Sequence, residues 1–189
     1  MNQSKANLFI VGAAKAGTTS VYDILSSANE VRMCRIKELH FFANDIVLSD
    51  FRLTYRKKYS DKEKGDKLNS NKEHHDIFGL STEEYEKLFN GLDNYKYRGE
   101  ASTSYLYSQN AAANIKEYNP HSKIIIVLRN PFERAYSHYK MNRMTGDDLS
   151  MTFSEALESD FRSLSKGWGK SHLYLELSLY YCQVKRYLD

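Results

Sequence analysis

The sequence predicts an α/β fold, a P-loop-like three-layer sandwich in which a central parallel sheet lies between helices. Residues 8–11 and 124–128 are short, continuously apolar stretches, which is typical of strands buried on both faces of a parallel sheet. Each stretch is followed by a loop and then by apolar residues at helical spacing. This repeated order of strand, loop and helix indicates the α/β class.

Each of the two strands leads into a helix. The first strand, at 8–11, ends at Gly12, and the helix predicted at 18–27 begins with Thr and Ser residues that can cap its first turn. The second strand, at 124–128, ends just before an Asn-Pro pair, which favours a loop. A helix is predicted after it, from 133 to about 143.

Shorter patterns place the remaining elements. A short strand is predicted at 97–100 and a helix at about 109–118. Capping-box patterns begin two further helices, one at Ser81 and the other at Thr152. The polar stretch 52–75 has few large apolar residues, and we expect it to be an excursion on the surface.

The composition favours one globular domain, which we expect to span residues 1–189. A hydrophobic share of 41% and an aromatic share of 13% exclude a largely disordered chain. No apolar run reaches the roughly 18 residues that a membrane-spanning helix needs. The net charge of +3 is too small to indicate duplex DNA, so no nucleic-acid partner is predicted, but it suits a compact anionic ligand.

The N-terminal residues favour a location in the cytoplasm, and the two cysteines give no sign of a metal or redox site. Cys34 and Cys182 are far apart and form neither a zinc-binding nor a CxxC spacing, so we predict buried thiols and no metal site. The first residues lack the apolar core of a signal peptide.

The loop after the first strand is a candidate phosphate site. Residues 12–20 read Gly-Ala-Ala-Lys-Ala-Gly-Thr-Thr-Ser, and backbone N–H groups between a strand and a helix bind anions well. Both glycines of the nucleoside-triphosphate motif GxxxxGK[ST] are present, but Thr18 replaces the motif's lysine, and the loop's own lysine is Lys15. After 124–128 stands Arg129, where a triphosphate enzyme tends to place a magnesium-binding Asp. An arginine there suits a further phosphate and repels a metal ion.

These two segments resemble those of the 3′-phosphoadenylyl-sulfate (PAPS)-dependent sulfotransferases, with the glycan- and heparan-modifying enzymes as the closest branch. Residues 15–20 resemble the family's 5′-phosphosulfate loop. Residues 128–139, Leu-Arg-Asn-Pro-Phe-Glu-Arg-Ala-Tyr-Ser-His-Tyr, resemble its 3′-phosphate motif. The resemblance implies PAPS as the cofactor, with no metal. It also implies that PAPS is bound by Lys15, Ala16, Gly17, Thr18, Thr19, Ser20, Arg129 and Ser137.

A third segment carries the expected catalytic base. Residues 37–42, Lys-Glu-Leu-His-Phe-Phe, resemble the KExxFF segment of the glycan-modifying branch, in which the glutamate takes the proton of the acceptor hydroxyl. The resemblance therefore implies Glu38 as the base, His40 as the reserve candidate, and Lys15 as the cation that stabilises the leaving phosphate oxygen. The alternatives are that Glu38 pairs with Lys37 or another surface cation, and that His40 is a packed or hydrogen-bonded imidazole.

Residues 99–106 resemble the family's GExSxxYL segment, which lies beside the active site. In the heparan N-sulfating relatives a catalytic lysine occupies the position of Ala101. Its absence argues against that subgroup and leaves Lys15 as the main cation. Ser102, Thr103 and Tyr105 are expected either to orient the acceptor or to cap the following helix.

The C-terminal residues 178–188 resemble the family's GxYxxQLxxWL helix, with Ser178 in place of the glycine. Family members continue beyond this helix, so the resemblance implies that the last part of the family domain is missing from residues 1–189. The alternatives are a naturally short protein and a fragment of a longer one. A fragment of an anchored eukaryotic protein would be located in the Golgi lumen.

Two weaker candidates lie in the polar stretch. The pair His74-His75 lacks the accompanying Cys or carboxylate cluster of a zinc site, so we expect it to be solvated. The run 56–58, Arg-Lys-Lys, either meets an anionic acceptor such as a glycan or is a solvated face.

The predicted function is the transfer of a sulfuryl group from PAPS to a hydroxyl or amine of a small molecule or, more specifically, of a carbohydrate or glycoconjugate. Two alternatives keep the fold. A P-loop nucleotide kinase would use ATP and magnesium, and a non-catalytic fragment would bind nucleotide without turnover.

Overall fold

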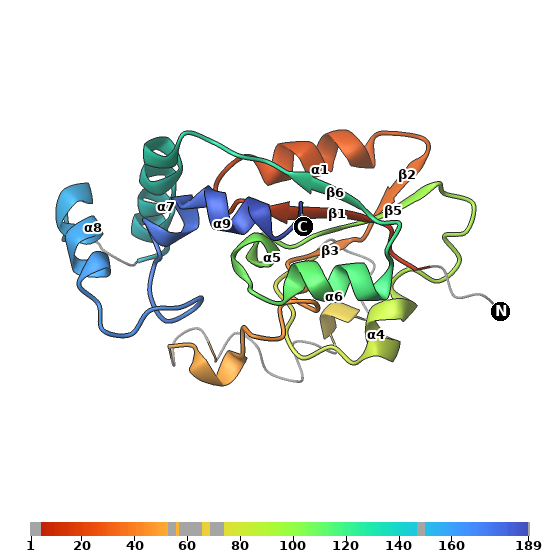
Figure 1. Cartoon of the computed structure of the whole chain (residues 1–189), viewed down its shortest axis with the longest axis horizontal. Helices are drawn as coiled ribbons and strands as arrows, with labels where there is room; N and C mark the ends of the chain where they lie inside the picture. The colour runs from red at the N-terminus through yellow and green to blue at the C-terminus, as the bar shows by residue number, and fades with distance from the viewer. Residues whose placement is uncertain (1–4, 53–55, 57–65, 69–73, 147–149, 189) are drawn as a thin grey trace.

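The computed structural model describes residues 5–52, 56, 66–68, 74–146 and 150–188 (Figure 1). Within these residues the chain forms a four-stranded, all-parallel sheet in the order β2-β5-β1-β6. Its strands are β1 (Leu8–Gly12), β2 (Val31–Met33), β5 (Tyr97–Ala101) and β6 (Lys123–Ile126). The predicted α/β fold with a central parallel sheet is therefore confirmed.

Strand β1 is the centre of the sheet. Leu8 pairs with Gly99 of β5 on one side and with Lys123 of β6 on the other, and all five residues of β1 are buried. Burial on both faces explains the continuous apolar run. The ladder to β6 shifts in register after Ile10, so the strand expected at 124–128 ends at Ile126. Val127 still donates a hydrogen bond to Gly12, the last residue of β1, and accepts one from Ala13.

Helices cover both faces of the sheet (Figure 1). Leu8 and Ile10 pack against α1 (Thr18–Ser26), whereas Phe9 and Val11 pack into a larger core on the opposite face. This alternation follows from the period of two along a strand. Four helices contribute to the larger core, namely α4 (Thr82–Lys87), α5 (Ser104–Tyr107), α6 (Ala111–Tyr118) and α9 (Tyr180–Lys185).

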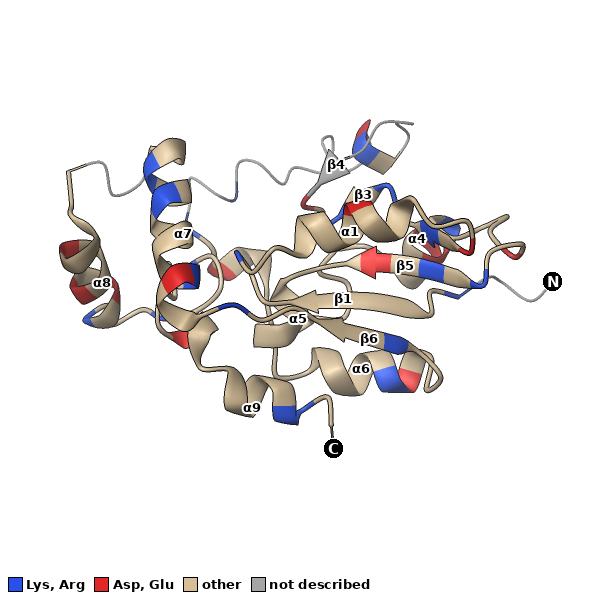
Figure 2. Cartoon of the chain, turned by 90° about the horizontal axis from the view of Figure 1, so that it is seen from above, with Lys and Arg blue, Asp and Glu red and all other residues tan. Residues whose placement is uncertain are grey.

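The other elements surround the carboxyl ends of the strands. In Figures 1 and 2 two helices lie beyond these ends, α7 (Pro131–Thr145) and α8 (Phe153–Phe161). The short elements are a second parallel sheet of β3 (Ile36–Lys37) and β4 (His74–His75), and the 3-10 turns η1 (Leu48–Asp50) and η2 (Glu176–Ser178). Among the helices formed by the described residues, none is long and apolar enough to cross a membrane.

Capping residues fix where the helices begin. The capping boxes predicted at Ser81 and Thr152 are both present, at α4 and α8. Helix α7 begins two residues earlier than predicted, because Asn130 Oδ1 accepts hydrogen bonds from the first-turn N–H groups and Pro131 suits the first helical position. Helix α6 begins at Ala111 and not at 109, since Ser108 Oγ accepts hydrogen bonds from the N–H groups of residues 110 and 111.

Most of the expected excursion at 52–75 lies outside the described residues, including Lys57 and Lys58. Its described part contains β4, whose backbone pairs with β3, and Leu68, which packs against the larger core. The excursion as a whole therefore stays a prediction.

A buried carboxylate joins the sheet to the helices of the larger core. Glu100 of β5 is fully buried. Its Oε1 accepts hydrogen bonds from Ser102 Oγ (2.7 Å) and Tyr105 Oη (2.6 Å), and its Oε2 accepts one from Tyr85 Oη of α4 (2.6 Å). Burial raises the pKa of Glu100, and the three hydroxyl donors partly offset this effect. Ser102 Oγ also accepts a hydrogen bond from the backbone N–H of Leu39 (2.9 Å), so the network reaches the turn after β3.

We predict that Glu100→Ala lowers the free energy of unfolding by at least about 3 kcal/mol, because three buried hydroxyls lose their acceptor. Glu100→Gln keeps the volume and one acceptor oxygen and should cost less. Urea denaturation followed by circular dichroism measures both changes. The control is Glu83→Ala, at an exposed position of α4, which should leave the free energy of unfolding close to the wild-type value. A Glu100→Ala loss no larger than that of the control would contradict the assigned role.

Candidate active site

One pocket collects most of the predicted site residues. It has a volume of about 560 Å³. Seven of the predicted residues line it, namely Lys15, Gly17, Thr18, Thr19, Glu38, Arg129 and Ser137. Three do not: Ala16 packs against the larger core, Ser20 is exposed on α1, and His40 is buried behind the pocket wall. Segments far apart in the sequence are thus brought to one cavity, as expected at the carboxyl ends of parallel strands.

The loop from Gly12 to the start of α1 has the shape of an anion site. Gly17 caps α1 in the left-handed region, at φ 99°, and the first turn of α1 holds no acidic residue. Gly12, at φ 141°, packs so closely that an added Cβ would lie 2.8 Å from the Cβ of Leu106. Both positions therefore require glycine. The result is a close-packed loop at the positive end of a helix dipole.

Lys15 extends over the pocket from the tip of this loop. Its Nζ lies 3.4 Å from Met141 Sδ on α7, a weak acceptor that satisfies little of an ammonium group. Burial lowers the pKa of Lys15, since desolvation disfavours the charged form. An anion bound here would give the Lys15 ammonium group the ionic partner that Met141 does not provide.

Lys37 is a second cation of the site, and the sequence interpretation missed it. Its Nζ donates a hydrogen bond to Thr19 Oγ1 (2.9 Å) and lies 4.8 Å from the ring centroid of Tyr22. The residue is only 6% exposed, so its charge is held against the phosphate loop. Lys37 and Glu38 are both described, and no ion pair joins them, which argues against the alternative that Glu38 serves as a partner for Lys37.

A turn in the backbone explains how Lys37 and Glu38 line the same pocket. Adjacent residues of a regular strand point to opposite faces. Glu38 has φ 56° and His40 has φ 53°, so the chain leaves the extended conformation directly after Lys37. The Glu38 N–H donates to the carbonyl oxygen of Ala101 (2.8 Å), and Ser102 Oγ accepts from the N–H of His40 (3.3 Å). The last residue of β5 and the residue after it thus stabilise an unfavourable backbone conformation at Glu38 and His40.

Glu38 is oriented by one neighbour. Its Oε2 accepts hydrogen bonds from the N–H (2.8 Å) and the Oγ1 (3.2 Å) of Thr103. Burial raises the pKa of Glu38, and the negative charge of Asp76 raises it further. His40 and the two bonds from Thr103 lower the pKa. The carboxylate is therefore fixed in position and more basic than an exposed one, as a proton acceptor needs to be.

His40 lies behind Glu38 in a packed environment. Its Nδ1 is 2.7 Å from Ser104 Oγ, its Nε2 is 3.5 Å from Asp76 Oδ1, and its ring stacks on Phe78 at 4.1 Å between centroids. The imidazole is 5% exposed and does not line the pocket. This arrangement is that of the packed, hydrogen-bonded imidazole named as the alternative for His40.

Arg129 and Ser137 form a separate pair of polar side chains in the pocket lining, suited to binding an anion. Arg129 stands in the loop before α7, and Ser137 lies on α7 about two turns later. Arg129 Nε pairs with Glu133 Oε2 at 3.1 Å, with both side chains about half exposed. An exposed pair of this kind contributes little, so it competes weakly with a phosphate for the guanidinium.

His138, one of the two histidines that line the pocket, carries no charge near neutral pH. His138, next to Ser137, lines the pocket, and burial lowers its pKa to about 3, with Arg134, His172 and Lys15 lowering it further. The positive charge of the pocket wall near the phosphate loop therefore comes from lysine and arginine.

The segment after β5 has mainly a structural role. Ser102 and Tyr105 are buried in the Glu100 network and do not reach the pocket. Thr103 precedes α5 but makes no side-chain cap, so the capping alternative is wrong for this helix. Of the three residues, Thr103 alone lines the pocket, where it holds Glu38.

The remaining candidates are not tested by the structure. The side chains of His74 and His75 are not described, and two of the three residues at 56–58 lie outside the described ranges. In the part of the chain that is described, no group of three or more His, Cys, Asp or Glu is placed to hold a metal ion.

Comparison with known proteins places this pocket in context. The model of a family described as "Sulfotransferase family" matches residues 7–176. Carbohydrate sulfotransferase 15 of Mus musculus is 28% identical over 175 residues, which cover 80% of this chain and 30% of that protein. The Homo sapiens protein of the same name is 27% identical over 175 residues, which again cover 80% of this chain and 30% of that protein. The chain thus spans about a third of the length of these relatives.

A solved structure is also similar. The crystal structure of a sulfotransferase from Alicyclobacillus acidocaldarius superposes with a TM-score of 0.75 at 31% sequence identity. The match covers 98% of this chain and 68% of that chain. Because the match covers nearly the whole chain, it supports the α/β fold with a central parallel sheet as a sulfotransferase fold.

We predict that Glu38 titrates above the ordinary carboxyl pKa, because its charged form is desolvated and faces Asp76. In Asp76→Asn the loss of a negative charge should lower the pKa of Glu38. The ¹³C shifts of the glutamate side-chain carboxyls, followed against pH in the full chain, measure both values. Glu83 is the internal control, since its bond to Lys87 lowers its pKa. A Glu38 midpoint at or below that of Glu83 would contradict the described environment.

Proposed function

The chain belongs to the sulfotransferase family, and from that premise we propose that it transfers a sulfuryl group from PAPS to a hydroxyl or amine of a carbohydrate or glycoconjugate. One observation carries the proposal: a single pocket is lined by the phosphate loop, by Glu38, and by Arg129 and Ser137. The names of the curated relatives, carbohydrate sulfotransferase 15, support a carbohydrate acceptor. The cytoplasmic location expected from the N-terminal residues stays a prediction.

The lining residues fit a donor with anionic groups at both ends. The loop amides at the start of α1, with Lys15, would hold the 5′-phosphosulfate, and Arg129 with Ser137 would hold the 3′-phosphate. Lys37 would support the first group, because it fixes the side chain of Thr19. When bound, PAPS supplies a sulfuryl group attached to a phosphate, which is a good leaving group.

The reaction requires a proton acceptor and a cation that stabilises the leaving group. Glu38 would accept the proton of the acceptor hydroxyl, and its hydrogen bonds from Thr103 hold the carboxylate in one orientation. Lys15 would stabilise the negative charge that the 5′-phosphate gains as the leaving group. The raised pKa of Glu38 makes it a stronger base. For the same reason, the rate should fall as the pH drops through that pKa and protonates the group.

The nucleotide that the chain binds more tightly distinguishes a sulfotransferase from a kinase. We predict that the full chain binds adenosine 3′,5′-bisphosphate without magnesium more tightly than ATP with magnesium. The reason is that Arg129 and Ser137 would bind the 3′-phosphate, a group that ATP lacks. Isothermal titration calorimetry measures both affinities. Lys37→Met should weaken binding of the bisphosphate by about tenfold through the loss of its bond to Thr19. The matched control is Lys123→Met, an exposed lysine at the start of β6. Tighter binding of ATP with magnesium would favour the kinase and overturn the proposal.

Turnover tests the catalytic roles. With a radiolabelled sulfate donor and a glycan acceptor, Lys15→Ala should lower kcat by roughly 10²- to 10³-fold, the usual cost of removing a donor that stabilises a developing oxyanion. Glu38→Gln keeps the shape of the side chain and removes the base, so it should also lose most of the activity. Lys123→Met should behave as the wild type. A chain that binds the bisphosphate but transfers no sulfate would support the non-catalytic alternative, and full activity in Glu38→Gln would exclude Glu38 as the base.

A further inference from the structure

Part of the pocket lining lies outside the segments proposed to hold the donor. Residues 163–173, called here the Trp168 loop, line the pocket with Trp168, Gly169, Ser171, His172 and Leu173. None of them belongs to the phosphate loop or to the segment of Arg129 and Ser137. Trp168 is the single tryptophan of the sequence.

The indole of Trp168 lies near His40 and lines the same pocket as the proposed base. Its ring centroid is 6.2 Å from that of His40, which is two residues from Glu38, and 6.0 Å from that of Tyr107. The aromatic group continues through Phe78, which stacks on His40 and contacts Phe51 at 5.1 Å. Phe51 lines the pocket as well. Two members of this aromatic group, Trp168 and Phe51, therefore line the same pocket as the carboxylate that would take the acceptor's proton.

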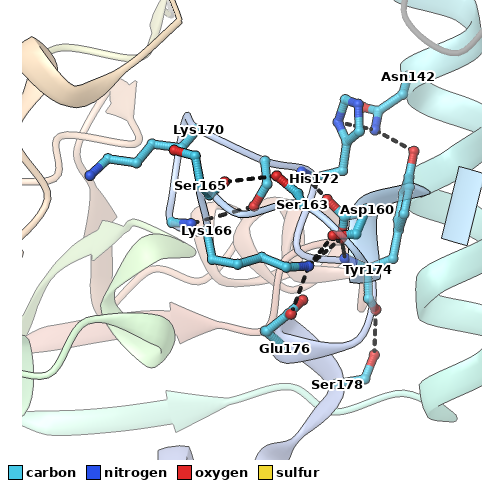
Figure 3. Close-up of polar contacts among 12 residues, drawn as sticks. Asn142, Asp160, Ser163, Ser165, Lys166, Lys170, His172, Tyr174, Glu176 and Ser178 are labelled. Atoms are coloured by element: carbon cyan, nitrogen blue, oxygen red, sulfur yellow. Dashed lines mark hydrogen bonds and ion pairs between the residues drawn. The ribbon is translucent and has the colours of Figure 1, made fainter. Parts of the chain in front are cut away.

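One end of the Trp168 loop is held by a buried acid. Asp160 of α8 accepts hydrogen bonds from the N–H of His172 (2.7 Å) and of Tyr174 (3.0 Å) (Figure 3). Lys166 Nζ lies between Asp160 Oδ2 (3.5 Å) and Glu176 Oε1 (3.0 Å). Because Asp160 is only 6% exposed, these bonds are shielded from water and fix the backbone of the loop.

The other side of the loop is held by the segment around η1. The Arg52 N–H donates to the carbonyl oxygen of Gly169 (3.0 Å), and Arg52 Nε donates to that of Lys170 (2.8 Å). Lys170 Nζ pairs with Asp50 at 2.7 Å. Gly169 has φ 75°, and an added Cβ would lie 2.4 Å from the ring of Phe51, so only glycine permits this approach. Trp168 thus stands on a loop that is fixed on both sides.

The polar atom of Trp168 is free for a ligand. Its indole N–H has no hydrogen-bond partner among the described residues, and the side chain is half-buried in the pocket wall. Tryptophan usually finds a partner for this group when it packs in a protein. A fixed aromatic face with an unused donor is suited to a ring that carries hydroxyl groups.

We propose that the Trp168 loop is the acceptor-binding wall, and that a sugar ring of the acceptor packs on the Trp168 indole with its reactive hydroxyl toward Glu38. This inference rests on the proposed function and adds the residue that selects the acceptor. It assigns Trp168 to acceptor binding only, so donor binding is independent of it.

Kinetics with Trp168 variants separate the two claims. In the full chain, Trp168→Ala should raise the KM for a glycan acceptor roughly 10- to 30-fold, the cost expected for a central aromatic contact. Its affinity for adenosine 3′,5′-bisphosphate should stay within about twofold. Trp168→Phe keeps an aromatic face and should retain most of the acceptor affinity. Tyr181→Ala, at a 78% exposed aromatic of α9, is the matched control. An unchanged acceptor KM in an active Trp168→Ala protein overturns the inference and leaves the proposed function standing.

Fluorescence tests the contact without turnover, since Trp168 is the only indole emitter. Unsulfated chondroitin, heparosan and dextran would each be added to the protein saturated with the bisphosphate. At least one of them should change the intensity or wavelength of the emission. No change with any of the three overturns the inference, whereas a failure to bind the bisphosphate at the start would count against the proposed function.

Discussion

The active site depends on the carboxylate of Glu100, which does not line the pocket. Glu100 is buried in β5 and binds the hydroxyls of Tyr85, Ser102 and Tyr105, which belong to the helices of the larger core or to the turn before them. Ser102 in turn accepts hydrogen bonds from the backbone after β3. A buried network in which the members satisfy one another specifies a single arrangement. Here it fixes how the turn that carries Glu38 lies against the end of the sheet.

That constraint gives the active site its geometry. With the turn held in a left-handed conformation, Lys37 points to the phosphate loop while Glu38 points into the same pocket. The loop itself is shaped by Gly12 and Gly17. Lys15, Lys37 and Glu38 are therefore brought together by backbone conformations that a regular strand or helix does not provide. Such conformations are typical of functional sites, where the surrounding structure compensates for the strain.

Local patterns were sufficient to predict the parts of the fold that local physics determines. The continuous apolar run of β1, the capping boxes of α4 and α8, and the order of strand, loop and helix were all predicted. The phosphate loop and Arg129 were identified by motif and position, and the structure brings them to one pocket. The strand expected at 124–128 was too long, because the shift in register beside β1 is a tertiary effect.

Side chains whose role depends on distant partners were not predicted. Lys37 was overlooked because neither its type nor its spacing shows that it reaches Thr19. Ser102 and Tyr105 have residue types suited to a site or a cap, and only the folded chain shows that they serve Glu100. Trp168 lies some 130 residues from Glu38 in sequence, and Asp160 and Arg52 hold its loop in place through contacts that no local pattern encodes.

The central claim is that one pocket holds the two ends of a 3′-phosphorylated nucleotide. A crystal structure of the full chain with adenosine 3′,5′-bisphosphate tests it most directly. The account predicts the 5′-phosphate on the backbone amides between Lys15 and Thr19, and the 3′-phosphate on Arg129 and Ser137. A nucleotide bound in the reverse direction, or outside the pocket, would contradict it.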